Sequence, residues 1–370
     1  MSTDSVLRQP RGIVKINGQA FKAADGWTEW EVDNNTFREA DTWSATFAIS
    51  QLKAPFDLNW FTQQTTVSAE LFGGMPPDPD DFSAADLTSY VYGNTDQISV
   101  SLEQGTITLS GRDLTSLLID AKTTEKFQNQ TASQVAKTLA ARHGLNPVVT
   151  DTQGLVGKFY EIDHVSLTTT NTEWDLLCWL AQLSGFVVYV QGHDLHFEPA
   201  PDPGANPYPI TWQPPSDNGW PVGNVESLTF QRTLTVGKGV VVQVRSWNQK
   251  QKKGFTATYP TSHAKGIKPG DSKSPAQVYS YVIANLTQEQ ANQKARALYN
   301  GIIQHEMRME CTLPADAALS KTSTIKVSGT GTAFDQVYYP ESITRRLGID
   351  AGFTMEVSAK NHSSDTAPIP

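Results

Sequence analysis

A pattern of an amphipathic helix, a glycine stop and an apolar strand is repeated within residues 106–197. Each helix is expected to begin at a threonine, Thr131 in the first copy and Thr172 in the second, with the polar residue of a capping box three positions later. Gly144 and Gly185 follow, where glycine commonly ends a helix. Because amphipathic helices must cover their apolar faces, the pattern predicts a helix-strand domain. The expected faces are Ala132, Val135, Ala136, Leu139 and Ala140, then Trp174, Leu177, Cys178 and Ala181.

A β-hairpin is expected to supply the sheet for these helices. Phe186–Val190 and Leu195–Phe197 are short apolar segments, and the polar residues 191–194 join them. Two apolar runs separated by a short polar turn containing glycine are typical of a hairpin. We therefore expect both helices to lie on this hairpin.

The length of 370 residues allows two or three domains, each with its own core. No apolar run approaches the roughly 20 residues that span a bilayer, and Met1–Ser5 lacks the basic start of a secretory signal. We therefore expect a protein without a membrane-spanning segment that is made in a cytoplasm. The only cysteines, Cys178 and Cys311, lack C-x-x-C spacing and are expected to be buried without forming a disulfide.

The charge is unevenly distributed. Residues 1–110 contain 6 Lys and Arg against 15 Asp and Glu, whereas the remaining 260 residues contain 23 of each and balance. The acidic part is either simply well solvated or forms a surface that repels nucleic acid. Between Arg232 and Lys273 there are nine basic residues and one acid, Asp271, with few aromatic residues among them. This favours a solvated loop or a contact for an acidic partner over a nucleic-acid platform.

Residues 1–108 are predicted to form a first antiparallel β-barrel domain. Apolar residues alternate with polar ones in segments 43–49, 67–71 and 97–102, which is the period of half-buried strands. Residues 73–81 are rich in Gly, Pro and Asp, so they are expected to form a surface loop. The expected turns lie at Asn17-Gly18, Asp25-Gly26 and Gly93-Asn94.

The remaining chain is divided into three further segments. The helix-strand domain covers 109–205 and ends in a proline-rich connection, and a second β-barrel domain covers 206–360. Alternating residues at 240–245 and 353–358 predict strands of this barrel, which is split at about 259–305 by a loop and a helix beginning at Thr287. Residues 361–370 are expected to be a flexible tail. The predicted class is α+β, mostly β, with two antiparallel β-barrel domains and an intervening helix-strand (α/β) domain.

The sequence offers no convincing catalytic, cofactor-binding or metal-binding residues. It lacks a G-x-S-x-G elbow, a P-loop, an H-E-x-x-H motif and a dinucleotide glycine fingerprint. His193 and His196, followed by Glu198, form an H-x-x-H, but residues three apart on an extended strand point to opposite faces. The chain is therefore not expected to be an enzyme, and no cofactor is expected.

Three weaker patterns are explained better by structural roles than by functional ones. The acidic cluster Asp78, Asp80 and Asp81 lacks the glycine and the final glutamate of an EF-hand loop, which favours a solvated loop. Carboxylate pairs of the kind that hydrolyse sugars can come from anywhere in a chain, so such pairs have almost no specificity. Tryptophans can line a carbohydrate groove, but these lie in apolar periodic segments that indicate a core. The pairs are Glu306 with Glu310 and Asp25 with Glu29, and the tryptophans are Trp43, Trp174 and Trp179.

Several segments resemble the baseplate hub proteins of contractile phage tails, including the Mu-like hubs and the late control D family. These segments cover nearly the whole chain and follow the order expected for that family. The segments 26–30 and 43–47 resemble the hairpin that opens the first barrel of these hubs. Segment 110–120 resembles the entry into their second domain, and 173–186 with 195–199 resembles its end. The segments resembling their second barrel are 240–247, 327–329 and 334–339.

The resemblance implies a structural protein of the virion, located in the tail baseplate. Three copies, each with two similar barrels, would form a pseudo-sixfold ring that adapts a hexameric tail tube to a trimeric spike and leaves a channel for DNA. The implied partners are two further copies, the tail tube or a distal tail protein, the central spike and other baseplate proteins. The alternatives are a tail-associated peptidoglycan hydrolase and a glycan- or receptor-binding tail protein.

Overall fold

The computed structural model describes residues 9–37, 39–123, 127, 130–153, 171–199, 207–216, 219–237, 239–248, 252–260, 277–283 and 286–361. The chain forms two compact units. Unit 1 contains Met1–Gly204, Thr312–Thr322 and Ser342–Glu356, and unit 2 contains Ala205–Cys311, Ser323–Glu341 and Val357–Pro370. With 49% strand and 21% helix, the structure confirms the predicted α+β, mostly β class. The expected tail beyond 361 and most of the basic stretch at 250–273 lie outside the described residues.

An antiparallel sheet forms the first part of unit 1. Its strand order is β2-β1-β5-β6-β7-β4-β3, and β3 pairs in addition with Ser342–Gly348 of β21. Trp30 and Phe47 are fully buried inside this sheet, as the alternating pattern predicts. The short helix α1 (Leu58–Gln63) is capped by Asp57, whose side chain accepts from Trp60 N. The strands are β1 (Arg11–Ile16), β2 (Gln19–Phe21), β3 (Trp27–Asn35), β4 (Thr42–Ala48), β5 (Ser68–Gly74), β6 (Thr88–Ser101) and β7 (Thr106–Asp113).

Two of the three predicted turns of this sheet are confirmed, and the third is wrong. Asn17 and Gly18 have positive φ between β1 and β2, and Gly26 has a φ of 114° before β3. Gly93, however, lies within β6, where a Cβ atom would stand 2.1 Å from the Arg112 carbonyl oxygen. Glycine at this position therefore permits two strands to approach closely instead of marking a turn.

The predicted loop at 73–81 begins later than expected. Gly73 and Gly74 belong to β5, and they pair with Gly12 and Arg11 of β1. A Cβ atom on Gly73 would stand 2.6 Å from Trp30 Cζ2, so this glycine makes room for a buried indole. The surface loop therefore starts after Gly74 and continues to the 3-10 turn at Ala84–Asp86.

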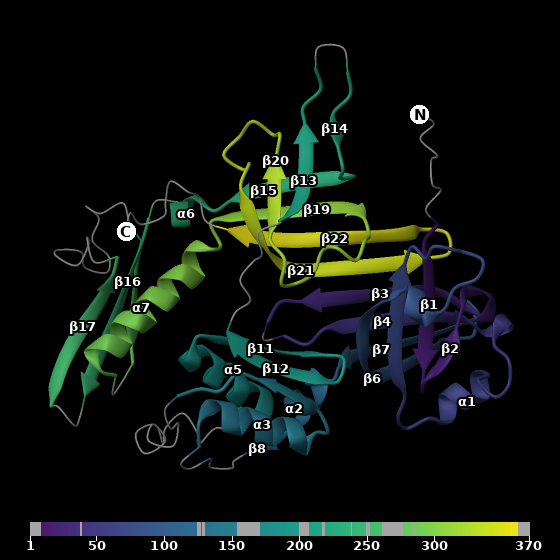
Figure 1. Ribbon diagram of the computed structural model, residues 1–370, viewed down its shortest axis with the longest axis horizontal. Coiled ribbons are helices and arrows are strands. Elements are labelled where there is room, and N and C mark those ends of the chain that lie inside the picture. The colour runs from purple at the N-terminus through teal and green to yellow at the C-terminus, as the bar shows by residue number, and fades with distance from the viewer. Residues whose placement is uncertain are drawn as a thin grey trace. The chain divides into compact units, whose positions relative to one another are not determined.

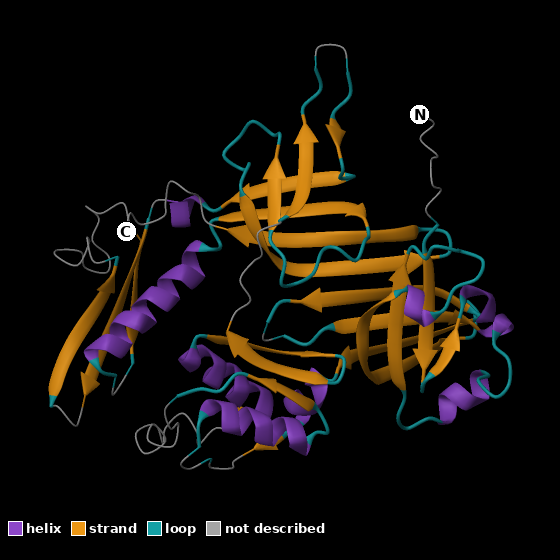
Figure 2. Ribbon diagram, in the orientation of Figure 1, coloured by secondary structure: helices purple, strands orange, loops and turns teal. Residues whose placement is uncertain are grey.

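The second part of unit 1 is the predicted helix-strand structure (Figure 2). Thr131 and Thr172 cap α3 and α5 with complete capping boxes, and Gly185 adopts the left-handed conformation with a φ of 69°. The expected hairpin is β11–β12, and β9 joins it in parallel beside β12. The bounds are α2 (Thr115–Asp120), β8 (Lys122–Thr123), α3 (Ala132–Arg142), β9 (Asn146–Val149), β10 (Asn171–Thr172), α5 (Glu173–Ser184), β11 (Phe186–Gln191) and β12 (Asp194–Pro199).

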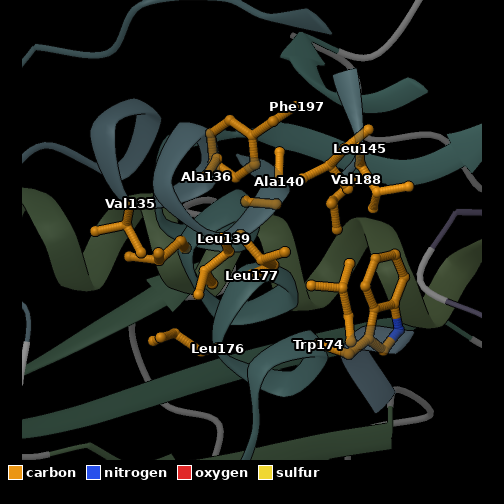
Figure 3. Packing of buried hydrophobic residues seen from close by; sticks show 14 of the residues in the cluster. Val135, Ala136, Leu139, Ala140, Leu145, Trp174, Leu176, Leu177, Val188 and Phe197 are labelled. Carbon is orange, nitrogen blue, oxygen red and sulfur yellow. The ribbon is translucent and has the colours of Figure 1, made fainter. Parts of the chain in front are cut away.

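The apolar faces of α3 and α5 pack against this sheet (Figure 3). Leu139 and Leu177 are fully buried between the helices, and Val188 and Phe197 bury their side chains from the strands. Each fully buried aliphatic or aromatic side chain contributes about 1.5–3 kcal/mol by leaving water. This core confirms the doubled pattern in the sequence.

Unit 2 contains a second group of paired strands that includes one parallel pair. β13 runs parallel to β20, whereas β20 pairs antiparallel with Val337 and Tyr338 of β21. The parallel pair differs from the purely antiparallel barrel that we expected. Strands β19, β21 and β22 contribute residues to both units. The bounds are β13 (Tyr208–Gln213), β14 (Val222–Gly223), β15 (Ser227–Arg232), β19 (Met307–Pro314), β20 (Ile325–Ser328), β21 (Val337–Gly348) and β22 (Gly352–Asn361).

The inserted segment of unit 2 has a sheet of its own. β16 (Val240–Asn248) is central, β17 (Lys253–Tyr259) pairs with it antiparallel, and β18 (Gln277–Val282) pairs with it in parallel. Helix α7 (Gln288–Ile303) lies along this sheet (Figure 1) and buries Ala291 and Ala295 against it. The short helix α6 (Leu234–Gly237) precedes β16.

We expected the strand at 240–247 to belong to the second barrel, but it pairs only within this separate sheet among the described residues. The period of two could not reveal this difference, since it does not identify a strand's partners. Among the described helices, none combines the length and the apolar character that crossing a membrane requires.

Candidate interaction surfaces

The two histidines of the H-x-x-H lie against different aromatic rings. The His193 ring is 4.3 Å from the ring of Tyr92, and the His196 ring stacks on Tyr189 at 4.4 Å. His196 Nδ1 is 3.1 Å from Glu198 Oε1. In the described part of the chain, no three metal-ligating side chains form a group. The structure therefore gives these histidines different packing partners.

The acidic cluster at 78–81 forms a local turn. Asp78 Oδ1 accepts from the backbone N–H groups of Asp80 and Asp81 at 2.9 and 3.3 Å. Asp80 lies 3.9 Å from Arg11 Nη2, and its side chain is 95% exposed. An aspartate that hydrogen-bonds its own following backbone is typical of a turn.

The carboxylates of the two candidate pairs lie in different environments. Glu306 is fully buried after α7, and Arg232 Nη2 donates to its Oε1 at 2.9 Å. Glu310 is exposed within β19. Asp25 accepts from Lys22 N at 2.9 Å and caps a 3-10 turn, while Glu29 is exposed on β3.

A shallow groove of about 450 Å³ lies on unit 1 beside Glu29. Hydroxyl groups from neighbouring strands form part of it, with 3.2 Å between Thr46 Oγ1 and Thr108 Oγ1. Ile349 is 58% exposed beside these hydroxyl groups. The other residues that line the groove are Thr28, Gln104, Thr106, Gly348, Asp350 and Ala351.

Two further acids of β3, Glu31 and Asp33, already have partners. Arg346 forms ion pairs with Glu31 and Glu356. The Thr344 hydroxyl donates to Asp33 Oδ1 at 2.8 Å. Exposed ion pairs of this kind stabilise a fold by only about 0–1 kcal/mol.

A buried polar junction, formed by Asn34, Asp41, Asp113, Lys321 and Arg345, lies inside unit 1. Asp41 accepts from Asn34 Nδ2 at 3.0 Å and from Lys321 Nζ at 3.3 Å. Arg345 Nη1 donates to Asn34 Oδ1 at 3.1 Å. Burial raises the pKa of Asp41, while Lys321 opposes this shift. Burial and the neighbouring Asp41 carboxylate raise the pKa of Asp113 to about 7.

The junction also reaches the helix-strand part of unit 1. Lys321 Nζ lies 5.1 Å from the centre of the Tyr189 ring on β11, in cation–π geometry. Phe37 packs on the same ring at 5.2 Å, and the Tyr189 hydroxyl donates to Glu198 Oε1 at 3.0 Å. Sequence reasoning missed this junction, because its members are far apart in the chain and follow no motif.

The tryptophans divide into core residues and exposed ones. Trp43 and Trp174 are buried, as predicted, and Trp179 is partly buried against the helix core. Trp220 is 90% exposed, and Trp247, on β16, is 57% exposed. The exposure of Trp247 was not predicted, because the sequence pattern assigned this strand to the second barrel.

Comparison with known structures identifies the fold. No family model and no curated protein matches the sequence. A tail protein from Neisseria meningitidis MC58 has a similar structure, with a TM-score of 0.67 and 15% identity over 95% of this chain and 97% of that chain. A 43 kDa tail protein of prophage MuSo2 from Shewanella oneidensis matches with a TM-score of 0.67 and 16% identity over 95% and 98%. The chain has the fold of phage tail proteins.

More distant structures share this tail-protein fold. Prophage tail protein gp18 from Listeria monocytogenes EGD-e matches with a TM-score of 0.56 and 12% identity over 96% of this chain and 95% of that chain. A chain of the Francisella PdpA-VgrG complex matches with a TM-score of 0.56 and 10% identity over 99% and 55%. At these identities the comparisons establish the tail-protein fold alone.

Proposed function

We propose that the chain is the structural baseplate hub of a phage tail and acts in the virion. The observation that carries this proposal is the extent of the structural likeness. Three phage tail proteins match at least 95% of this chain and at least 95% of their own length. A likeness over whole chains includes both β regions and the helix-strand part, so it supports a shared role better than a single shared domain would.

The proposed role is to connect tail components that have different rotational symmetries. Three copies form a ring, and the two β regions of each copy give this ring a pseudo-sixfold surface. A hexameric tail tube, or a distal tail protein, stacks on that surface, while the true threefold symmetry suits a trimeric central spike. Other baseplate proteins would contact the outside of the ring. Such a role needs rigid complementary surfaces and no reactive groups.

Passage of DNA through the ring is the second element of the proposal. The acidic first β region would line part of the channel, where like charge keeps DNA from binding as it passes. The contacts of the acids at 25–41 restrict which of them can act in this way. Asp25 caps a turn and Asp41 belongs to the buried junction, whereas Glu29 and Glu39 are exposed.

The channel proposal predicts slower DNA ejection from virions that carry Glu29→Gln and Glu39→Gln, with normal assembly. A matched control is Glu103→Gln, which removes an exposed acid from the same unit outside residues 25–41. The measurement is the rate of DNA release from purified virions. Normal ejection from the double variant would contradict the channel role and leave the hub role standing.

The hub role itself is tested by removing the gene from the phage genome. We expect no complete tail tips by electron microscopy, and we expect a plasmid copy of the gene to restore them. Complete tails in its absence would contradict the proposal.

A further inference from the structure

The three-stranded sheet of unit 2 has one face that is partly exposed. Val240, Val242 and Val244 pack on α7, so the alternate residues of β16 point to the opposite face. On that face Arg245 is exposed, and Trp247 is 57% exposed. The central strand of this sheet therefore presents a cation and an indole side by side.

Neighbouring strands extend this face with further apolar and basic groups. Val282 of β18 pairs with Arg245 and is 82% exposed. A Cβ atom on Gly254 would stand 3.0 Å from Trp247 Cε3, so the indole lies against the bare backbone of β17. Lys252 is exposed at the turn between β16 and β17, whereas Lys253 pairs with Asn248 and points to the α7 face. We call Arg245, Trp247, Lys252 and Val282 the basic indole face.

The loop at 75–82 of unit 1 has the opposite chemistry. Its sequence is Met-Pro-Pro-Asp-Pro-Asp-Asp-Phe. Pro77, Asp78, Asp80 and Asp81 are exposed, and Met75 is 37% exposed. Prolines restrict the backbone, so a proline-rich loop loses little conformational entropy when it binds. Proline rings commonly dock on aromatic side chains.

We propose that the basic indole face of one copy binds the 75–82 loop of a second copy. The exposed Pro77 ring would stack on Trp247, and the aspartates would lie beside Arg245 and Lys252. The contact joins two different surfaces, so it is heterologous and generates a ring when the rotation closes. The inference rests on the proposed ring of copies and names two surfaces through which neighbouring copies meet.

The test is the self-association of the full chain by analytical ultracentrifugation over a range of concentrations at low salt. We expect Trp247→Ala to weaken association by about tenfold or more, as truncation of a central interface tryptophan commonly does. The matched control Trp220→Ala removes another exposed indole of unit 2 and should change association by less than about twofold. Higher salt should weaken wild-type association, since exposed charges are screened.

Charge reversal separates contacts between copies from contacts within one chain. Variant A carries Arg245→Glu and Lys252→Glu, and variant B carries Asp80→Lys and Asp81→Lys. Asp78 is left unchanged, because its side chain holds the turn of the loop. Each variant should fail to associate alone, and the two should associate when mixed, because the mixture restores opposite charges. Lys326→Glu, an exposed reversal elsewhere in unit 2, is the control for variant A.

Several outcomes would overturn the inference. A monomeric wild-type chain at every concentration, equal effects of Trp247→Ala and Trp220→Ala, or no association of A with B would each contradict it. Binding of a single-stranded oligonucleotide that is lost with Trp247→Ala would instead assign the face to nucleic acid. A tail-tip reconstruction with three copies, in which this face contacts no neighbouring copy, would overturn the inference and leave the proposed hub standing.

Discussion

Lys321 forms a largely buried ion pair with Asp41, with 3.3 Å between Nζ and Oδ2, although 280 residues separate them in sequence. Lys321→Met should destabilise unit 1 by about 3 kcal/mol, because removal of one partner leaves a buried carboxylate without its cation. Adding Asp41→Asn should recover part of this loss. Urea unfolding checks the prediction, with the exposed Lys326→Met as the control. Equal stabilities of the two methionine variants would contradict it.

The raised pKa of Asp113 predicts a pH-dependent stability. Burial and the Asp41 carboxylate raise this pKa to about 7, so the native state holds a proton that the unfolded chain releases near 3.8. The stabilisation is complete below about pH 4 and is lost as the pH rises toward 7, with a slope of at most about 1.4 kcal/mol per pH unit.

The check is the difference in unfolding free energy between wild type and Asp113→Asn at pH 5, 6, 7 and 8. An asparagine can still accept the Thr115 N–H bond, which is 3.1 Å long in the native chain. We expect the stability of wild type relative to the variant to fall between pH 5 and 7 and then level off. A constant difference across this range would show that Asp113 does not titrate there.

Two glycine substitutions should change stability in opposite directions. Gly73→Ala places a Cβ atom 2.6 Å from Trp30 Cζ2, inside a packed core, and should destabilise by about 1–3 kcal/mol. Gly301→Ala meets no atom within 4 Å in helix α7 and should stabilise by up to about 1 kcal/mol. Chemical denaturation of both variants measures the sign of each change in the free energy of unfolding. Destabilisation of equal size at both positions would contradict this packing account.

Glu173 joins the ends of the two helices in the helix-strand part. Its Oε2 is 2.6 Å from His143 Nε2, and Arg142 pairs with its Oε1. Glu173 is 3% exposed, so Glu173→Gln should cost about 1–3 kcal/mol by weakening two charge-assisted hydrogen bonds. Asp175→Asn, which changes only the exposed capping box of the same helix, should cost less. Thermal unfolding of the two variants compares these losses.

The sequence was sufficient to predict local structure where the chemistry is local. Thr131 and Thr172 could be identified as helix caps because a capping box involves residues three positions apart, and Gly185 because a helix end needs a left-handed residue. The turn predicted at Gly93 is wrong. Glycine is needed there because the Arg112 carbonyl approaches from another strand, and a local pattern does not show such an approach.

The buried junction and the exposed indole could not be predicted for a related reason. Asp41 and Lys321 meet only after the chain has folded, and a lone acid and a lone lysine form no motif. Trp247 lies in an apolar alternating segment whose partners decide its exposure, and the period of two does not identify those partners. The resemblance across ordered segments was more informative, because it combines many weak local matches.

The central claim is that three copies of this chain join the tail tube to the spike. A cryo-electron microscopy reconstruction of the purified tail tip, with this chain placed in the density, tests it most directly. The account predicts a threefold ring of three copies, with both β regions facing a sixfold tube on one side and the spike on the other. Six copies per tail, or copies located along the tube or away from its axis, would contradict it.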